Sequence, residues 1–327
     1  MRICLILLAI VQQLCAQRYL ISVGNRCGFL NQEGKVVIDP QFDHAQDFSE
    51  QLAAVLKEGK YGYLNENGEW RIQPKFQDAG EFHEGIAKAK EDDSWGFINQ
   101  KGEWIVFPEY SNAKSFSEQK AAVKIGRKWG FINPKGEVII EPIFDEAGKF
   151  IQNRARISLN GKFGYIDGNG RLVIPALYEK ALWFSENRAA VRIQNKYGFI
   201  DSTGKLTIEP QFHTAIEFSE GLAGVGVKEC SICPDEPIKY GFIDKKGNFI
   251  IEPKFDHISN FKEGLASVKM KDKFGCINPQ GDWVIPPKFD FIGSFQNGLA
   301  KANKEKFTGY LNKDGKLIWK TEFDREE

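Results

Sequence analysis

Glycine recurs in this chain at a fixed interval of 34 residues, with a single longer gap of 43. The nine glycines at this spacing are Gly28, Gly62, Gly96, Gly130, Gly164, Gly198, Gly241, Gly275 and Gly309. Most lie between two aromatic residues, as in Tyr61-Gly62-Tyr63. A strict period of this length indicates a repeat array, in which each unit buries its apolar face against its neighbours. We therefore expect one array, although 327 residues would also accommodate two domains.

The sixth unit shows how the first half of each repeat is built. Rings and β-branched residues over 196–200 predict a strand. Asp201 and Gly204 then occupy the first and fourth positions of a type I turn, with glycine at a left-handed bulge. We expect a short second strand over 206–208 to end at Pro210, because proline lacks the N–H that a strand ladder needs.

The second half of each repeat contains a corner and a further strand. Phe212, Ala215 and Phe218 stand at steps of three, which predicts one tight helical or 3₁₀ turn. Alternating small and β-branched residues over 222–225 predict a third strand. We expect the glycine between the rings, Gly198 here, to let neighbouring units approach, because a Cβ would strike the next unit.

These units predict an all-β fold of nine repeats of about 34 residues, each a three-stranded antiparallel meander plus a corner turn. We favour an open solenoid or superhelix, and the alternative is a closed β-propeller. Propellers usually have about four to eight blades, and this chain begins and ends with whole units. The first and last units have Cys27 and Thr308 in place of a ring, which suggests end caps that face water on one side.

The repeating pattern is similar to that of a known family. It reads aromatic-Gly-Phe-Ile-Asn/Asp-x-x-Gly, then Val/Ile-x-Pro-x-Phe-Asp, then Phe-Ser-Glu-Gly-Leu-Ala, and so resembles the WG-containing repeat family over nearly the whole chain after residue 16. The literal Trp-Gly pair occurs at Trp95-Gly96 and Trp129-Gly130. The resemblance implies a β-rich repeat of bacterial, often exported proteins, without an assigned activity and without catalytic residues to transfer.

The first sixteen residues stand outside the period. One basic residue, Arg2, precedes an apolar stretch that ends at Ala16, which is typical of a secretory signal peptide and too short to span a bilayer. We therefore expect a signal peptide at 1–16, one array at 17–327, and a secreted, periplasmic or envelope location. A lipoprotein anchored at Cys15 is the alternative.

Charge is balanced, with 44 basic and 44 acidic residues. This balance argues against a nucleic-acid partner bound through bulk charge, and no stretch predicts a membrane span. The partner that we expect is a protein or an envelope glycan.

Nine extra residues, 228–236, interrupt the period before the seventh unit. Insertions on a rigid repeat are places where function is often found. Within this one, Cys230 and Cys233 favour a local disulfide, with free thiols or metal or redox chemistry as alternatives. A zinc site would need a second ligand pair, and no second Cys-x-x-Cys motif exists.

Three tryptophans occupy the same repeat position on the second strand, Trp70, Trp104 and Trp283. If exposed, their indoles are a candidate binding surface for a sugar ring or an extended peptide. Val36, Val138 and Leu206 fill that position in other units, which favours core packing.

The corner after the core aromatic is often acidic. The residues are Asp43, Asp145, Glu179, Asp256, Asp290 and Asp324. Such residues cap turns, and we favour that interpretation, but a row of carboxylates could also serve a hydrolase.

No serine, histidine and acid set, phosphate loop or metal-ligand spacing is present in the sequence, so we predict no catalytic residues, no metal and no cofactor. The expected function is a non-catalytic, exported binding scaffold. A hydrolase that uses the corner acids, or a purely structural spacer, are the alternatives.

Overall fold

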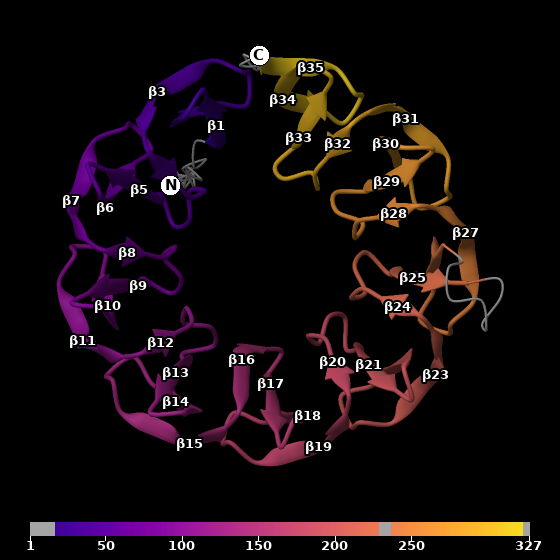
Figure 1. Ribbon diagram of the computed structural model, residues 1–327, viewed down its shortest axis with the longest axis horizontal. Helices are drawn as coiled ribbons and strands as arrows, with labels where there is room; N and C mark the ends of the chain where they lie inside the picture. The colour runs from indigo at the N-terminus through magenta and orange to yellow at the C-terminus, as the bar shows by residue number, and fades with distance from the viewer. Residues whose placement is uncertain (1–16, 229–236, 323–327) are drawn as a thin grey trace, which may run out of the picture.

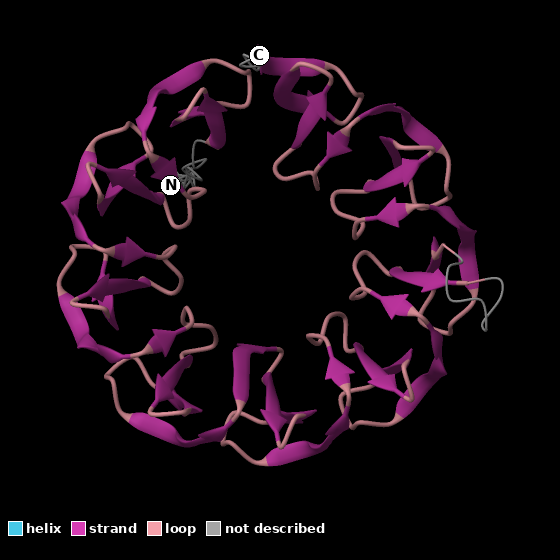
Figure 2. Cartoon of the chain, in the orientation of Figure 1, coloured by secondary structure: helices cyan, strands magenta, loops and turns pink. Residues whose placement is uncertain are grey.

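The computed structural model describes residues 17–228 and 237–322. In this part of the chain every regular element is a β-strand, and the strands form nine antiparallel sheets arranged as a ring (Figures 1 and 2). We call each sheet a blade and number the blades along the chain.

Blade 1 has three described strands, β1 (Tyr19–Val23), β2 (Arg26–Leu30) and β3 (Val36–Phe42). Blades 2 to 5 have four each: β4 (His44–Ala45), β5 (Leu52–Lys57), β6 (Lys60–Asn65), β7 (Trp70–Phe76); β8 (Asp78–Ala79), β9 (Ile86–Glu91), β10 (Ser94–Asn99), β11 (Trp104–Tyr110); β12 (Asn112–Ala113), β13 (Ala121–Ile125), β14 (Lys128–Ile132), β15 (Val138–Phe144); β16 (Glu146–Ile151), β17 (Arg154–Leu159), β18 (Lys162–Ile166), β19 (Leu172–Tyr178).

Blades 6 to 9 repeat this pattern: β20 (Lys180–Ala181), β21 (Ala189–Ile193), β22 (Lys196–Ile200), β23 (Leu206–Phe212); β24 (Thr214–Ala215), β25 (Ala223–Val227), β26 (Lys239–Ile243), β27 (Phe249–Phe255); β28 (His257–Ile258), β29 (Ala266–Met270), β30 (Lys273–Ile277), β31 (Trp283–Phe289); β32 (Phe291–Ile292), β33 (Leu299–Lys304), β34 (Phe307–Asn312), β35 (Leu317–Glu322). The last strand of each blade lies on the outer rim of the ring (Figure 1).

The turn between the last two strands of each blade is the predicted Asx-Gly turn. In blade 2 the Gly68 N–H donates to the Asn65 carbonyl at 2.9 Å, and Gly68 has φ +82°. The Asn65 side-chain oxygen also accepts the N–H of Asn67 and of Glu69, each at 3.0 Å. The repeated Asn or Asp therefore fixes the turn through its own side chain.

Two local predictions were wrong. The corner is not helical: in most blades it starts with a two-residue strand, such as β8, which pairs with the following strand. The strand after the Asx-Gly turn, which we predicted as the second strand of the repeat, is the last strand of the blade and does not end at proline. Pro74 lies inside β7, where the pairing jumps from Tyr61↔Phe76 to Tyr63↔Ile72. This bulge leaves Pro74 opposite no partner, so its missing N–H breaks no ladder bond.

Aromatic pairs fill the junctions between blades. A ring on the third strand of one blade meets a ring on the corner of the next at 4.8–5.0 Å between centroids, in the pairs Phe29–Phe48, Tyr63–Phe82, Phe97–Phe116, Phe131–Phe150, Tyr165–Phe184, Phe199–Phe218 and Phe242–Phe261. Most are edge-to-face or tilted, the geometry that aromatic pairs prefer. The core is therefore a series of similar inter-blade layers.

The open solenoid that we favoured is wrong, because blade 9 packs against blade 1 (Figure 1). The rings of Tyr19 and Tyr310 lie 5.6 Å apart. The Tyr310 hydroxyl donates to the Leu20 carbonyl at 2.7 Å, and the Tyr19 hydroxyl donates to the Asn297 carbonyl at 2.6 Å. The fold is therefore the alternative, a closed β-propeller of nine blades, and the end units are not caps. Thr308 is buried, and Cys27 is half-buried.

Candidate binding surface on the inner hairpins

The first and second strands of blades 2 to 9 are joined by hairpins that point to the centre of the ring (Figure 1). We call these the inner hairpins. Their tips are two-residue turns in the left-handed region, such as Glu118 at φ 52° and Gln119 at φ 60°. The first tip residue is Glu50, Glu84, Glu118, Gln152, Glu186, Glu220, Glu263 or Asn297. Six of eight are glutamates, so the tips form a carboxylate-rich row around the centre.

These carboxylates join each inner hairpin to the next. Glu50 accepts the Gly85 N–H at 2.9 Å, Glu220 accepts the Gly264 N–H at 2.9 Å, and Glu263 accepts the Gly298 N–H at 2.9 Å. The same link runs from Glu84 to Glu118 and Gln119, from Glu118 to Asn153, from Gln152 to Asn187 and from Glu186 to Gly221. Sequence analysis missed these links because their partners stand about one repeat apart.

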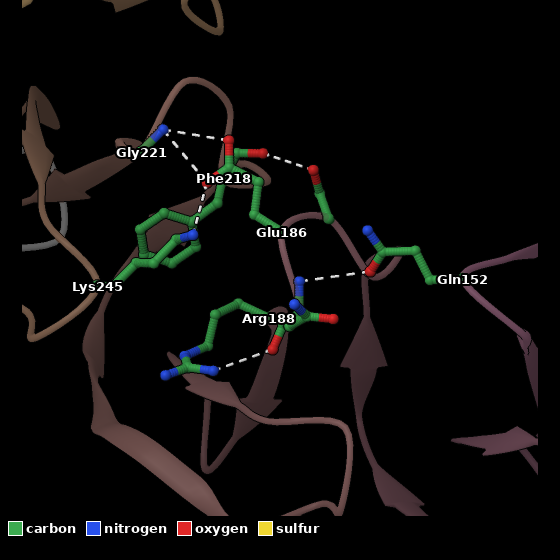
Figure 3. A network of polar contacts seen from close by, with 8 residues as sticks. Gln152, Glu186, Arg188, Phe218, Gly221 and Lys245 are labelled. Carbon is green, nitrogen blue, oxygen red and sulfur yellow. Dashed lines mark hydrogen bonds and ion pairs between the residues drawn. The ribbon is translucent and has the colours of Figure 1, made fainter.

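Glu186 shows the full set of contacts at one junction (Figure 3). Its carboxylate accepts the Gly221 N–H at 3.1 Å and pairs with the Lys245 ammonium at 2.9 Å. Burial opposes ionisation of this group, but Lys245 and the tip N–H groups outweigh it and lower the pKa of Glu186. The neighbouring Ser185 hydroxyl donates to the Phe218 carbonyl at 2.6 Å. A carboxylate held in this way is a structural anion, poorly suited to act as a general acid.

Positions flanking the tips differ from blade to blade. The two residues before the corner Phe are Gly80-Glu81, Lys114-Ser115, Gly148-Lys149, Leu182-Trp183 and Ile216-Glu217 in blades 3 to 7. Around them the glycine, ring and alanine positions repeat. The fold therefore holds a constant frame with individual side chains at the inner hairpins, as binding surfaces on repeat scaffolds do.

A cleft of about 250 Å³ lies among the inner hairpins of blades 3 to 6. It is lined by His83, Lys114, Ser115, Phe116, Ser117, Lys149 and Trp183. Gly148 makes room for the indole, since a Cβ at Gly148 would lie 2.0 Å from the Trp183 ring. We call this cleft the inner-hairpin cleft. Its wall combines cations, hydroxyls and an aromatic ring, which suits recognition of an anionic group.

Two further cations stand on the second strands of the same blades. The Lys88 ammonium lies 4.2 Å from the centroid of the Trp95 ring and donates to the Ala113 carbonyl at 3.3 Å. The Arg156 guanidinium lies 4.7 Å from the centroid of the Trp183 ring and donates to the Ala181 carbonyl at 2.8 Å. These contacts hold the two cations in place through aromatic faces and backbone carbonyls.

Burial lowers the pKa of both Lys88 and Lys114. Asp78 and Glu146 act in the opposite direction on Lys88 and Lys114 respectively, while Lys114 lowers the pKa of Lys88 and Arg156 lowers that of Lys114. The cations of neighbouring blades therefore lie close enough to repel one another.

The corner acids have a different setting. Asp145 pairs with Lys128, Asp256 with Lys239 and Asp290 with Lys273, and in each case the hydrogen bond to the lysine is the largest cause of a lowered aspartate pKa. Asp43 pairs with Arg26, and Glu179 pairs with Arg192 at 3.1 Å.

The three aspartates paired with lysine also bind backbone N–H groups of the next hairpin, as when Asp256 accepts the Lys271 N–H at 3.0 Å. Asp145, Asp256 and Asp290 therefore bridge blades as ionised groups. Asp324 lies outside the described residues.

The three candidate tryptophans begin outer strands. Trp70 meets Phe42 at 5.9 Å, Trp104 meets Phe76 at 5.5 Å, and Trp283 meets Phe255 at 6.0 Å between ring centroids. Each indole thus packs edge-on against a ring of the preceding blade. Trp70 and Trp104 are half-buried, and Trp283 is 37% exposed. The structure places them on the outer rim, and their use as a ligand surface stays a prediction (Figure 1).

Other chemistry-bearing residues are dispersed. Cys230 and Cys233 lie outside the described residues, and Cys27 and Cys276 are unpaired thiols. Burial raises the pKa of Cys276 to about 12, which makes it a poor nucleophile. Across 17–228 and 237–322, no three His, Cys, Asp or Glu side chains gather as a metal site. The same residues contain no helix that could cross a bilayer.

A larger groove of about 1030 Å³ lies at the junction of blades 1 and 9. It is lined by Gly24, Phe291 and Lys301, among others, and it reaches Glu322.

A crystal structure of the eukaryotic initiation factor has a similar fold at low identity: it is 12% identical, covers 94% of this chain and 96% of its own, and has a TM-score of 0.66. Apo AztD from Citrobacter koseri is 11% identical, covers 94% and 95%, and has a TM-score of 0.48. No curated protein sequence matches the chain.

The sequence pattern described as the WG containing repeat matches eight segments, at residues 28–61, 61–94, 95–129, 129–163, 163–197, 197–228, 240–274 and 274–306. These matches cover most of the chain, and the chain belongs to the WG-containing repeat family.

Proposed function

We propose that this chain is an exported, non-catalytic binding scaffold that holds a protein partner on its inner hairpins. The observation that carries the proposal is the contrast between the repeated frame and the non-repeating cluster at Lys114, Lys149 and Trp183. A closed ring fixes the spacing of successive hairpins, so a ligand can contact several of them without ordering the scaffold first. Export rests on the signal-like sequence of residues 1–16.

The non-catalytic part of the proposal is supported by how the carboxylates are used. Glu186 at a hairpin tip and Asp256 at a corner are both ionised partners of lysine and backbone N–H groups. Neither has the raised pKa that a general acid needs near neutral pH.

Affinity capture tests the proposal. The purified ring, immobilised through its outer rim, is exposed to an envelope extract of the source cell, beside a Trp183→Ala variant and a Trp283→Ala variant. We expect a captured protein that is depleted with Trp183→Ala and retained with Trp283→Ala. Equal capture by all three forms, or no capture, would contradict binding at the inner hairpins.

A parallel assay addresses the hydrolase alternative. The protein is offered glycosidic and ester substrates, and we expect no turnover above a heat-denatured sample. Turnover that disappears in Asp145→Asn or Asp256→Asn would replace the scaffold proposal with an enzyme.

A further inference from the structure

The inner hairpins of blades 3 to 5 carry four cations on successive blades, Lys88, Lys114, Lys149 and Arg156. The whole chain is balanced at 44 basic and 44 acidic residues, so this cluster is local. Local positive charge in a half-buried setting attracts anions far more than the same charge spread over a surface.

These cations lack carboxylate partners within bonding distance. Among the residues that the structure describes, the side chains of Lys114 and Lys149 make no hydrogen bond or ion pair, and the Lys114 ammonium lies 5.6 Å from the centroid of the Trp129 ring. By contrast, lysines at the outer corners, such as Lys239, each hold an aspartate. Acidic groups do lie nearby. Asp78, Glu146 and Glu81 are close to the cations, and the tip carboxylates Glu84 and Glu118 accept backbone N–H groups of the next hairpin.

Glu81 pairs with His83 at 3.5 Å when the imidazole is charged, and it makes no ion pair with Lys114 or Lys149. Burial has already removed water from Lys114. A carboxylate that enters the cleft and pairs with Lys114 would therefore gain more than it would from a fully solvated lysine, and Lys149, which is exposed, adds a second positive charge.

The arrangement of the cations indicates the shape of the ligand. They follow the ring from blade to blade, and both indoles beside them, Trp95 and Trp183, already have a cation over the ring. A sugar would need an open aromatic face for stacking, whereas carboxylates along an extended backbone need only spaced cations and hydroxyls. Ser115 in the cleft supplies such a hydroxyl, whereas the Ser117 hydroxyl already donates to the Phe150 carbonyl at 2.6 Å.

We infer that the inner-hairpin cleft and the adjoining cations Lys88 and Arg156 bind an acidic peptide segment of a partner protein. The inference rests on the proposed scaffold function and names the chemistry of its ligand. Lys114 and Lys149 pair with carboxylates of the peptide, and the Ser115 hydroxyl binds its polar groups.

The test measures binding of a labelled peptide of alternating Glu and Ser by fluorescence anisotropy at low and physiological salt. Its neutral twin has Gln in place of Glu, and a galacturonate oligomer supplies the same carboxylates on a glycan. We expect binding of the Glu peptide only, weakened as salt rises, because the contact is ionic.

Charge reversal locates the contact. Lys114→Glu with Lys149→Glu should weaken binding of the Glu peptide at least about tenfold, the effect of losing one paired charge. The matched control, Lys205→Glu with Lys246→Glu, makes the same change in net charge on exposed turns of blades 6 and 7 and should leave binding unchanged.

Three outcomes would overturn the inference: equal binding of the Glu and Gln peptides, equal loss in both double variants, or preference for the galacturonate oligomer. Envelope capture that survives Lys114→Glu with Lys149→Glu would retain the scaffold function while removing the acidic ligand. If the wild-type ring captured no envelope protein but still bound the Glu peptide, the scaffold function would be contradicted while the acidic-peptide site would be retained.

Discussion

At the scale of single residues, the repeated glycine and the repeated proline lie against each other in the same blade. In blade 2 a Cβ at Gly62 would lie 2.6 Å from the Ile72 carbonyl oxygen and 2.7 Å from the Pro74 nitrogen. The bulge of β7 brings this backbone toward the glycine, and proline fits there because no N–H is required. The glycine thus serves its own blade, and our expectation that it spaces neighbouring units was wrong.

Blade 9 offers a natural comparison. It has Thr321 where most blades have proline, and its pairing runs without a break from Phe307↔Glu322 to Tyr310↔Trp319. Gly309 is nevertheless retained, and a Cβ there would lie 2.3 Å from the Trp319 carbonyl oxygen. Close backbone approach, with or without the bulge, therefore explains the glycine.

A Gly62→Ala variant should lose about 1–3 kcal/mol of unfolding free energy, because the obstructing atoms belong to the backbone and cannot move aside cheaply. Urea denaturation followed by tryptophan fluorescence measures this. The control is Gly59→Asn, at a turn with φ +78° and no atom within 4 Å, which should stay within about 0.5 kcal/mol of wild type. Equal losses in both variants would contradict the crowding argument.

At the scale of elements, the inner hairpins combine two tasks. Their tips link consecutive blades through carboxylate-to-amide bonds, while the positions just before the corner phenylalanine carry the individual side chains. Gln152 stands at one tip and accepts the Asn187 N–H at 3.3 Å, so a neutral amide also fits the link. The hydrogen bond between hairpins therefore does not require a charged acceptor, and the charge of the tip glutamates can be removed without removing the bond.

A Glu186→Gln variant tests this. At pH 7 it should lose about 0.5–1 kcal/mol, the usual contribution of a partly exposed ion pair, here the one with Lys245. The folded pKa of Glu186 is lowered, so this stability is present above the unfolded pKa and is lost as pH falls through the folded pKa. The variant and wild type should therefore converge at the acid end of a series of urea midpoints.

The control for this series is Glu58→Gln, an exposed glutamate on the turn between β5 and β6. It should follow wild type at every pH. A Glu186→Gln deficit that stays constant down to pH 2.5 would show that the ion pair is not its cause.

At the scale of the whole molecule, the ends of the chain meet through the same kind of contact that joins internal blades. Tyr310 donates to Leu20 across the last junction, as Tyr63 donates to Gly80 at 2.8 Å across an internal one. In the part of the chain that the structure describes, no strand of blade 9 pairs with blade 1. Closure in this part comes from side-chain packing and a few polar contacts.

Circular permutation should therefore succeed. Residue 327 is joined to residue 17 by a six-residue Gly/Ser linker, and new termini are opened between Gly126 and Arg127, on an exposed turn. We expect a monomer that unfolds in one cooperative transition, like the native chain. Six residues reach about 20 Å at most, so in an open array of about 90 Å the linker would force misfolding or association, which size-exclusion chromatography would reveal.

Much of the element order could be predicted from the sequence, because the turn at Asn65 to Gly68 and the alternation within strands depend on local residues. Ring closure could not, because the rotation between successive blades results from whole packed faces and belongs to no single position. The prediction that the strand ends at the repeated proline was wrong for a related reason. A missing N–H argues against a strand only where a neighbouring strand has a carbonyl in position to accept a hydrogen bond from it, and Pro74 has no such neighbour.

The candidate surface has a signal in the sequence, namely variation at positions within an otherwise repeated unit. Residues that repeat, such as the corner phenylalanines, indicate the frame of the fold and do not indicate this surface. Lys114, Lys149 and Trp183 stand at two positions that vary among the units. Their proximity depends on the ring, which brings side chains 34 residues apart onto adjacent hairpins.

The links between inner hairpins all point the same way. Each described carboxylate, from Glu50 to Glu263, accepts from the hairpin that follows it in the chain, never from the one before. The two directions around the ring are therefore chemically different, because each junction has its acceptor carboxylate on the earlier hairpin and its donor N–H on the later one. In the proposed complex, a peptide that runs in the direction of the links would meet the hairpin groups in one order, and a reversed peptide would meet them in the opposite order. The ring would therefore distinguish the two directions of a bound peptide.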